Sequence, residues 1–159
     1  METNVIDKVR VEPAKFVITK DHTGNENGFL IEMFKDAAGE KTEVYLSAAN
    51  PGAFKGYHLH RVRAARYVCL RGKMRIILYQ QQRGEDGKTR WVREEHILDA
   101  TDISKPQRLF IPKEVATGLE NIGDEIGWLV NYPDPPYDPS LRDEQVEYTQ
   151  EELEQGVVK

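Results

Sequence analysis

The chain has 159 residues, of which 39% are hydrophobic and 31% charged, and its formal net charge is -5 at pH 7. This length suits one compact domain and is too short for two typical ones. The negative charge argues against nonspecific nucleic-acid binding, and no apolar run approaches the ~20 residues of a membrane-spanning helix. We therefore expect a single soluble domain over 1–159, located in the cytoplasm.

Short apolar or alternating runs recur along the chain and are separated by turn-forming Gly, Pro, Asn and Asp residues. In chain order the runs are KFVIT, GFLIEMF, TEVYLS, RYVCL, MRIILY, TRWVRE, RLFIP and GWLVNY. This rhythm predicts an all-β fold, built as an antiparallel barrel or sandwich. The single cysteine, Cys69, lies inside one of these runs, which predicts a small packed apolar side chain rather than a catalytic thiol.

The connections between the runs carry their own signals. Gly72, between Arg71 and Lys73, permits the positive φ of a tight turn and predicts a hairpin of the two flanking runs. The loop RGEDGK at 83–88 is rich in charge and turn residues, so we expect it in solvent. The prolines of 131–139 predict an extended segment that leaves the sheet.

The two ends of the chain are expected to lie outside the barrel. Residues 1–12 are predicted to form an N-terminal arm, and 140–159 a short helix or a charged tail. Ser140 is a candidate N-cap for this helix, and Gly156 is a candidate stop signal.

Two histidines, His58 and His60, stand one residue apart in the stretch GYHLHR. In a strand they share one face, while Tyr57 and Leu59 take the other. If the histidine face lines a barrel, both imidazoles enter its pocket, where a pKa near 6.5 allows proton exchange at neutral pH. The alternatives are metal ligands, ordinary polar surface or a phosphate-binding pair.

In part, the chain resembles the two sequence motifs of cupin barrels, which carry the metal ligands of that fold. The matching residues are Gly52, His58, His60, Gly72, Pro112 and Asn121. Ala65 stands at the glutamate position of the first motif, and in the second Glu114 replaces a glycine and Thr117 a histidine. Because alanine and threonine are not strong ligands, we expect the cupin barrel without a bound metal, and no other cofactor.

Several stretches together resemble the dTDP-4-dehydrorhamnose 3,5-epimerase family. NENGFLIEMFK at 25–35 is similar to the family's opening motif, LSAANPGAFKGYHLH to its histidine segment and RLFIPKEVATGLENI to a third motif, and YDP at 137–139 is shared. The ordered matches run from about residue 13 to 139, and each is weak by itself. The resemblance implies a dimeric, jelly-roll cupin barrel that acts on a nucleotide-linked 4-keto sugar without metal.

This resemblance implies roles for individual residues. His58 falls on the general base, which removes the acidic proton beside the C4 ketone. The family's tyrosine falls opposite Asn131, with Tyr132 one residue away, so either is a candidate donor to the substrate. The aspartate that orients the base falls near Gln150 or Glu151.

Other positions depart from the epimerase pattern. Asn27 replaces a phosphate-contacting arginine, Lys55 replaces another arginine, His60 replaces glutamine and Thr117 replaces histidine. Sugar-nucleotide 3,4-ketoisomerases explain part of this, because KGYHLHR and VCLRG resemble their histidine segment and the strand that follows. In that branch two imidazoles move protons between C3 and C4, which makes His60 a second acid or base.

Basic residues around the histidines are candidate contacts of a diphosphate. They are Lys55, Arg61, Arg63, Arg66 and Arg75. If the strand is regular, Arg61 and Arg63 lie on the face opposite the histidines. We assign catalysis to His58, His60 and Tyr132, and substrate binding to a second set: Glu32, Lys55, Arg66, Arg75 and Asn131. The alternative is a binding or structural cupin, which keeps the barrel and binds a small molecule without turnover.

Overall fold

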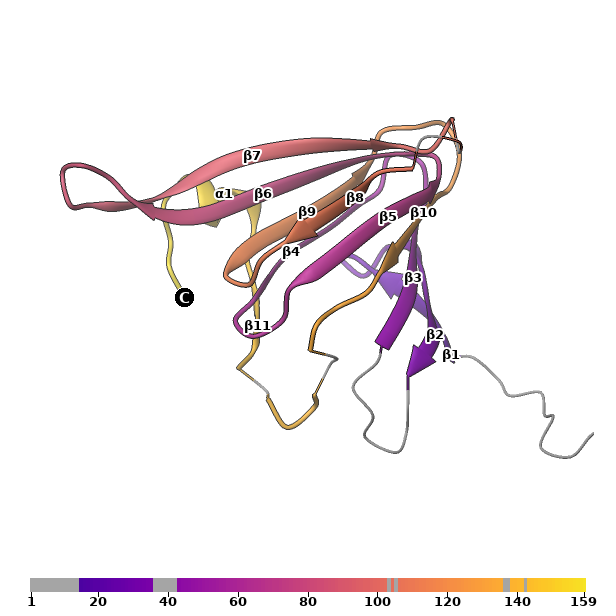
Figure 1. Ribbon diagram of the computed structural model, residues 1–159, viewed down its shortest axis with the longest axis horizontal. Helices are drawn as coiled ribbons and strands as arrows, with labels where there is room; N and C mark the ends of the chain where they lie inside the picture. Colours follow the sequence, from indigo (N-terminus) through magenta and orange to yellow (C-terminus); the bar gives the residue numbers. More distant parts are fainter. Residues whose placement is uncertain (1–14, 36–42, 103, 105, 136–137, 142) are drawn as a thin grey trace, which may run out of the picture.

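Figure 1 shows the protein as a computed structural model, which describes every residue except 1–14, 36–42, 103, 105, 136–137 and 142. The side chains of residues 15 and 32–35 also lie outside the described part. The predicted N-terminal arm falls in the first of these ranges. In the described part of the chain, no helix is long and apolar enough to span a bilayer.

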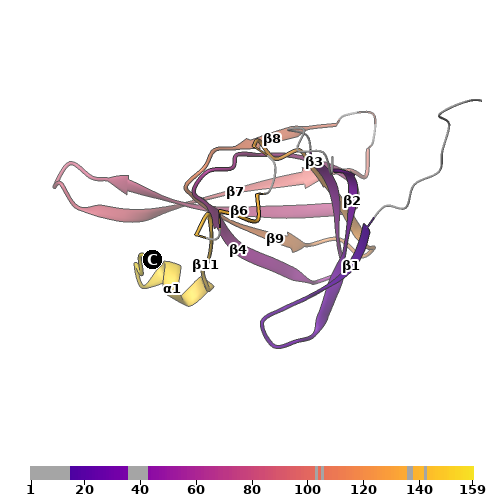
Figure 2. The same cartoon turned by 90° about the horizontal axis from the view of Figure 1, so that it is seen from below.

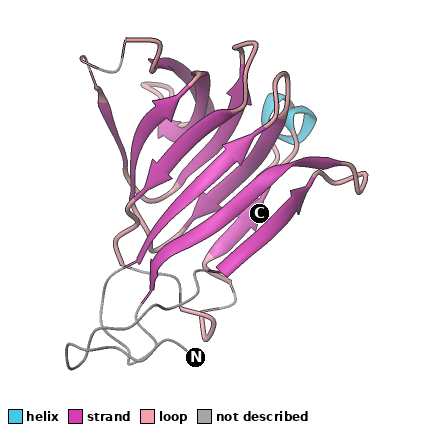
Figure 3. Cartoon of the chain, turned by 90° about the vertical axis from the view of Figure 1, so that its right-hand side faces the viewer, coloured by secondary structure: helices cyan, strands magenta, loops and turns pink. Residues whose placement is uncertain are grey.

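Nearly all regular structure is β-strand, as the short alternating runs predict (Figure 3). The elements are β1 (Lys15–Lys20), β2 (Glu26–Lys35), β3 (Glu43–Ala49), β4 (Phe54–His60), β5 (Ala65–Arg71), β6 (Lys73–Arg83), β7 (Thr89–Asp99), β8 (Arg108–Ile111), β9 (Val115–Asn121), β10 (Gly127–Asn131), β11 (Gln145–Glu147) and the helix α1 (Gln150–Glu154).

The strands form two antiparallel sheets. One has six strands in the order β1-β2-β3-β10-β5-β8, and the other has five in the order β11-β4-β9-β6-β7. The long β6–β7 hairpin reaches beyond the rest of the sandwich (Figure 1), and its tip is the solvated loop that the charges of 83–88 predict. The all-β, jelly-roll prediction is confirmed.

The main core lies between the two sheets, because alternate residues of each strand point inward. Its buried members are Ala49, Cys69, Met74, Ile76, Leu78, Leu98, Ile111, Val115, Leu119 and Leu129. Cys69 is therefore a packed apolar residue, as its sequence context predicts.

A second apolar cluster, the outer cluster, lies on the far face of the five-stranded sheet. It consists of Tyr57, Leu59, Ile77, Tyr79, Ala116, Tyr148 and Leu153. Leu153 belongs to α1, and Tyr148 lies just before the helix N-cap Thr149, so the C-terminal segment covers this face (Figure 2). The far face of the six-stranded sheet instead exposes apolar side chains. We call this set the apolar face, and it consists of Phe16, Ile18, Leu70 and Phe110.

The predicted hairpin at Gly72 is wrong. Gly72 has the expected positive φ of 83°, but β5 pairs with β10 and β8, whereas β6 pairs with β7 and β9. The glycine is a corner at which the chain crosses from one sheet to the other. A local turn signal does not distinguish such a corner from a hairpin, because partner strands are chosen by the packing of the whole domain.

The C-terminal helix exists but begins later than predicted. Thr149 is its N-cap and forms a capping box with Glu152, the reciprocal arrangement that satisfies two amide groups at a helix start. Ser140 instead bonds to the Asp138 carboxylate, with its amide at 2.9 Å from Oδ1. Gly156 follows the helix with a φ of 78°, which agrees with its predicted role as a stop signal.

Candidate active site

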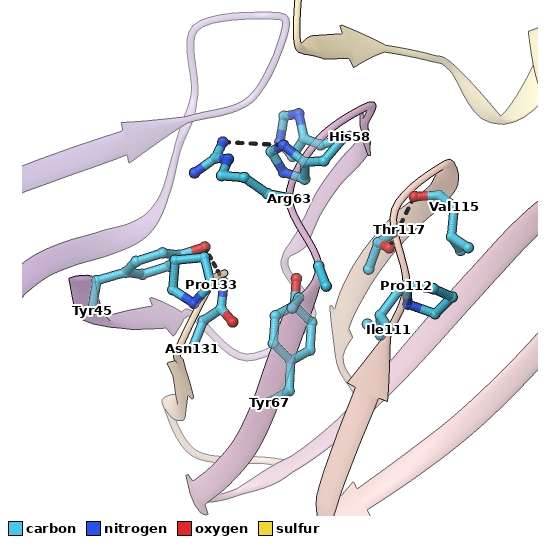
Figure 4. A pocket seen from close by; sticks show the side chains of 13 residues that line it. Tyr45, His58, Arg63, Tyr67, Ile111, Pro112, Val115, Thr117, Asn131 and Pro133 are labelled. Carbon is cyan, nitrogen blue, oxygen red and sulfur yellow. Dashed lines mark hydrogen bonds between the residues drawn. The ribbon is translucent and has the colours of Figure 1, made fainter. Parts of the chain in front are cut away.

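A cavity of about 70 Å³ opens between the two sheets at the end of β4. Both sheets contribute side chains, and the lining combines imidazoles, phenols, an arginine and an amide with apolar groups. The lining residues are Tyr45, His58, His60, Arg63, Ala64, Ala65, Tyr67, Ile111, Pro112, Val115, Thr117, Asn131 and Pro133. Figure 4 shows Tyr45 and Asn131 on one side, Pro112 and Thr117 on the opposite side, and His58 and Arg63 toward one end.

Strand alternation in β4 brings both histidines to this cavity. His58 and His60 line it, while Tyr57 and Leu59 point away and are buried in the outer cluster. Thr117 stands beside His58 on the neighbouring strand β9. The period-two pattern of the sequence therefore predicts the orientation of the histidines correctly.

A buried charge cluster holds His60 in place. Its Nδ1 lies 3.1 and 3.2 Å from the two carboxylate oxygens of Glu144 and 3.0 Å from Arg63 Nη2. Arg63 also binds Glu144 directly, with 3.3 Å between Nε and Oε2 and 3.1 Å between its backbone nitrogen and Oε1. Glu144 lies just before β11, so this cluster joins the C-terminal segment to the barrel.

The position of Arg63 corrects the expectation that it shares a face with Arg61, opposite the histidines. Strand β4 ends at His60, and the chain bends through the next residues before β5 begins at Ala65. Because alternation stops there, Arg63 turns back into the cavity, where its side chain is buried. Arg61 remains near the surface and pairs with Glu114 at 3.5 Å.

The protonation of this cluster follows from its surroundings. Burial alone raises the pKa of the Glu144 carboxyl, but hydrogen bonds from His60 and from the Arg63 amide outweigh it and leave the pKa below its ordinary value. Burial lowers the pKa of His60, and the nearby Arg63 charge lowers it further. Burial also lowers the pKa of His58. The carboxylate is therefore ionised and both imidazoles are neutral near pH 7.

Two phenols face the histidines from the six-stranded sheet. Asn131 donates from Nδ2 to the Tyr45 hydroxyl at 2.7 Å, and its Oδ1 accepts from the Arg66 amide at 3.1 Å. Because the Tyr45 oxygen accepts this bond, its own hydrogen is free to be donated to a ligand. Burial raises the pKa of both Tyr45 and Tyr67, which keeps the two hydroxyls protonated.

Tyr132 lies outside the cavity. It is 40% exposed, and its ring lies 5.8 Å from the Arg66 guanidinium on the outer side of the six-stranded sheet. Asn131 lines the cavity, and Tyr132, the next residue in the chain, points the other way. A tyrosine hydroxyl is nevertheless present at this position, because Tyr45 on the adjacent strand β3 reaches Asn131.

Arg66 and Arg75 also point away from the cavity. Arg66 stacks on the Phe110 ring at 5.4 Å. Arg75 lies on the outer face of the five-stranded sheet, 3.2 Å from a carboxylate oxygen of Glu120. Both belong to the outward-facing set of their strands, so the structure does not bring them to the histidines.

Lys55 points into the sandwich but lies beyond the cavity lining. Its Nζ donates to Ser47 Oγ at 3.2 Å and to the Phe29 carbonyl at 3.5 Å. Burial lowers the pKa of this ammonium group to about 8. The backbone of Glu32 pairs with Tyr45 across β2 and β3, while its side chain lies outside the described residues.

The cavity does not fit a cupin metal site. Ala65 and Thr117, at the positions of two usual ligands, both line it. Among the described residues, no group of three His, Cys, Asp or Glu side chains is arranged to hold a metal ion. Glu114, at the position of a cupin glycine, adopts a positive φ of 64°, the left-handed conformation that favours glycine.

Sequence reasoning missed part of this site. It gave no role to Tyr45, did not single out Tyr67, Glu144 or Gln145, and placed Arg63 on the wrong face. The sequence predicts a short helix or a charged tail around Glu144, and no local pattern sets this residue apart from its neighbours. Alternation within TEVYLS does place Tyr45 and Ser47 on one face, which was the one available signal.

No protein-family profile matches the chain. A curated relative is the probable low-salt glycan biosynthesis epimerase Agl13 of Haloferax volcanii, which is 27% identical over 127 residues, covering 76% of this chain and 78% of the relative.

Solved structures with this fold include three relevant cases. The capsular polysaccharide assembling protein CapF from Staphylococcus aureus superimposes with a TM-score of 0.61 at 18% identity, over 83% of this chain and 34% of CapF. A dTDP sugar isomerase from Desulfovibrio desulfuricans G20 gives 0.56 at 20% identity, over 88% and 86%. A cupin-2 domain from Rhodospirillum rubrum gives 0.60 at 13% identity, over 94% and 84%.

The chain therefore spans only about a third of the length of CapF, but most of the epimerase, the sugar isomerase and the cupin-2 domain. The chain thus has a cupin fold, and its sequence is similar to that of a probable glycan biosynthesis epimerase.

Proposed function

We propose that the protein catalyses proton transfer beside the keto group of a nucleotide-linked sugar, as an epimerase or isomerase. The observation that carries this proposal is one cavity that holds two neutral imidazoles, His58 and His60, opposite the protonated hydroxyl of Tyr45. The epimerase relative supports the reaction class. A 4-keto deoxysugar carried by dTDP is the specific substrate that we propose.

The chemistry needs a base and a donor. A ketone at C4 acidifies the C–H bonds at C3 and C5, so a neutral imidazole can accept one of these protons. Negative charge then develops on the carbonyl oxygen, and a hydrogen-bond donor held in place stabilises it. Tyr45 takes the donor role that the resemblance assigns beside Asn131, because its hydroxyl has a hydrogen to give. Delivery of a proton by a second donor to the other face of the carbon gives the epimer.

The nucleotide lies outside the cavity in this proposal, since about 70 Å³ has room for only part of a sugar. Lys55 is the proposed phosphate contact. Among the described residues, its hydrogen-bond acceptors are neutral, a hydroxyl and a carbonyl, so a phosphate oxygen would supply a negative charge. Asn27, the other position that departs from a phosphate-binding arginine, donates to the carbonyl of the adjacent Phe54 at 3.3 Å.

A 3,4-ketoisomerase is the second candidate. It is favoured by one observation, the presence of both histidines in a single cavity where the epimerase pattern has histidine and glutamine. Two imidazoles along one sugar edge suit a transfer of hydrogen from C3 to C4 through an enediol. Movement of the keto group distinguishes this reaction from inversion at C3 or C5.

The direct test incubates the protein with dTDP-linked 4-keto sugar in deuterium oxide and follows the sugar by NMR. We expect deuterium beside the ketone, and its loss in a double His58→Asn, His60→Asn variant. His96→Asn is the matched control, because His96 pairs with exposed Glu94 on β7, away from the cavity. Binding without exchange over hours would instead make the protein a noncatalytic sugar-nucleotide binder.

We further propose that the protein is a homodimer formed through the apolar face of the six-stranded sheet, and that it acts in the cytoplasm. Exposed apolar side chains lie on β1, β5 and β8 of this one sheet. These strands lie toward the two edges of the sheet. Exposed apolar side chains on one face are typical of a protein interface, and a two-fold axis lets the same face serve both copies.

A further inference from the structure

The two cavity histidines differ in what their Nδ1 atoms contact. His60 Nδ1 faces the ionised Glu144 carboxylate, while His58 Nδ1 faces the side-chain amide of Gln145 at 3.3 Å. In a neutral imidazole only one nitrogen carries hydrogen, and the contact made by one nitrogen decides the state of the other. The contacts of Nδ1 therefore determine what each Nε2 can do.

At His58 the partner is a donor. The Gln145 amide lies between Arg63 and His58, with its Oε1 3.5 Å from Arg63 Nη2. The cation requires oxygen on its own side, so the NH2 group points to His58 Nδ1 and donates to it. The exposed Glu147 carboxylate lies 3.7 Å away, beyond hydrogen-bond distance. His58 Nδ1 is thus an acceptor, and its hydrogen is on Nε2.

At His60 two groups compete for Nδ1. Arg63 Nη2 lies at 3.0 Å and would require a lone pair there, whereas the Glu144 oxygens at 3.1 and 3.2 Å require a hydrogen. A lone pair on His60 Nδ1 would repel the two anionic oxygens of Glu144. The carboxylate cannot turn away, because the backbone amide of Arg63 also binds it. A hydrogen on His60 Nδ1 costs Arg63 only the contact of its Nη2, because its Nε keeps the hydrogen bond to Glu144. The hydrogen is therefore on Nδ1.

We propose that His60 is the base of the site, with its free Nε2 lone pair available to the cavity, and that His58 is a hydrogen-bond donor through Nε2–H. This inference rests on the proposed function and reverses the assignment that the epimerase resemblance implies, in which His58 is the base. Glu144 and Gln145 are positioning residues, because they act on the substrate only through the two imidazoles.

The resulting proton transfer is balanced. His60 Nε2 takes a proton from the carbon beside the ketone, and the electron pair of the broken C–H bond forms the C=C bond of an enolate. The carbonyl π electrons move to oxygen, where His58 Nε2–H and the Tyr45 hydroxyl donate hydrogen bonds. His60 becomes an imidazolium that pairs with Glu144. Return of a proton from His60 to the same face of the carbon completes hydrogen exchange, whereas inversion requires a second donor that delivers a proton to the opposite face.

The first test needs no substrate. Long-range 1H–15N spectra of the full-length protein near pH 7.5 distinguish protonated from unprotonated imidazole nitrogens, and single His→Gln variants assign the signals. We expect the hydrogen on Nδ1 in His60 and on Nε2 in His58. Glu144→Gln should move the His60 hydrogen toward Nε2, because Arg63 then donates to Nδ1 without opposition. Glu147→Gln is the matched control and should leave His60 unchanged.

The second test compares His58→Gln with His60→Gln in the deuterium-exchange reaction. A glutamine amide can place an N–H group near the position of Nε2. The exchange rate of His58→Gln should therefore stay within about tenfold of the wild type, which corresponds to the loss of about one hydrogen bond. His60→Gln removes the base and should lose about 10²- to 10⁴-fold.

The two tests separate the two proposals. A His60 hydrogen found on Nε2 in the wild type overturns the assignment whether or not any sugar reacts, and so does exchange that survives His60→Gln but not His58→Gln. Absence of exchange in the wild type counts against the proposed function alone, because the spectra still decide the positions of the hydrogens.

Discussion

The outer faces of the two sheets differ in what covers them. On the five-stranded sheet, the chain's own C-terminal segment packs over the outer cluster, and α1 lies against this side of the barrel (Figure 2). On the six-stranded sheet, the apolar face remains exposed, including Phe16 and Phe110, each 56% exposed. Both faces are apolar, so hydrophobicity alone does not decide which one the chain covers.

The segment that covers the five-stranded sheet also has a second role. Covering an apolar face orders extra residues, which costs conformational entropy, and this chain does so on the side where the covering segment also supplies Glu144 and Gln145 to the histidines. The C-terminal segment thus contributes both to stability and to the site. The apolar face carries no cavity residue and is available to a second copy.

The largest expected effect comes from Glu144, which anchors the covering segment and is only 6% exposed. Glu144→Gln removes a carboxylate that binds the buried Arg63 guanidinium, and breaking a buried ion pair typically costs about 3 to 5 kcal/mol. Chemical denaturation at pH 7 measures this. The matched variant Glu147→Gln, on the same segment but with a side chain 74% exposed, should change stability by less than about 1 kcal/mol.

The free energy of unfolding of the wild type and of Glu144→Gln should also depend differently on pH. Because the folded-state pKa of Glu144 is lowered, its contribution is complete above the unfolded value near 4.3 and is lost as pH falls through the folded value. The stability difference between wild type and Glu144→Gln should therefore shrink below about pH 4. A difference that stays constant down to pH 3 would mean that the carboxylate charge does not hold the segment.

Leu153→Ala tests the covered face by creating a cavity. Leu153 is 2% exposed in the outer cluster, so its truncation should cost about 2 to 5 kcal/mol. Leu70→Ala is the matched change on the apolar face, where Leu70 is 43% exposed, and at low protein concentration it should cost below about 1 kcal/mol. Equal losses in denaturant titrations would show that the two faces do not differ in the isolated chain.

Phe110→Glu tests whether a second copy covers the apolar face. A charge placed in an apolar interface should weaken self-association at least about tenfold, or 1.4 kcal/mol, so the mass measured by sedimentation should fall from two chains to one. Ile97→Glu is the control, because Ile97 is 44% exposed on the outer side of β7 in the other sheet. A wild-type protein that is monomeric at high concentration would contradict the dimer.

The smallest expected effect comes from Thr149→Ala, which removes the N-cap of α1. Loss of such a cap typically costs about 1 kcal/mol. Hydrogen exchange should show faster opening at Leu153 than in the core strand β6, because only the covering segment is weakened. Uniformly faster exchange throughout the barrel would mean that α1 and the sheets open as one unit.

The strands were predictable from the sequence because burial alternates along several of them, such as β4 and β10. Runs such as MRIILY put Met74 and Ile76 on one face and Ile77 on the other, and the structure places these faces in the core and the outer cluster respectively. The same rule oriented His58 and His60. Strand partners were not predictable: Gly72 gives the same local signal at a corner between sheets as in a hairpin.

The remaining parts of the site depend on contacts between distant residues. Glu144 reaches His60 across 84 positions of the chain, and Tyr45 replaces an expected tyrosine only because β3 pairs with β10. Neither relation leaves a local pattern. The bend after His60, which brings Arg63 into the cavity, ends the strand alternation on which the sequence argument relied.

The two tryptophans of the chain lie on opposite outer faces. Trp91 packs against the outer cluster and donates from Nε1 to the Val157 carbonyl at 2.9 Å, whereas Trp128, on β10 of the six-stranded sheet, lies under the Arg71 guanidinium at 5.2 Å. Each is therefore a built-in fluorophore for one face. In a Trp128→Phe variant, the emission of Trp91 should report release of the C-terminal segment, and in Trp91→Phe the emission of Trp128 should report events on the other sheet.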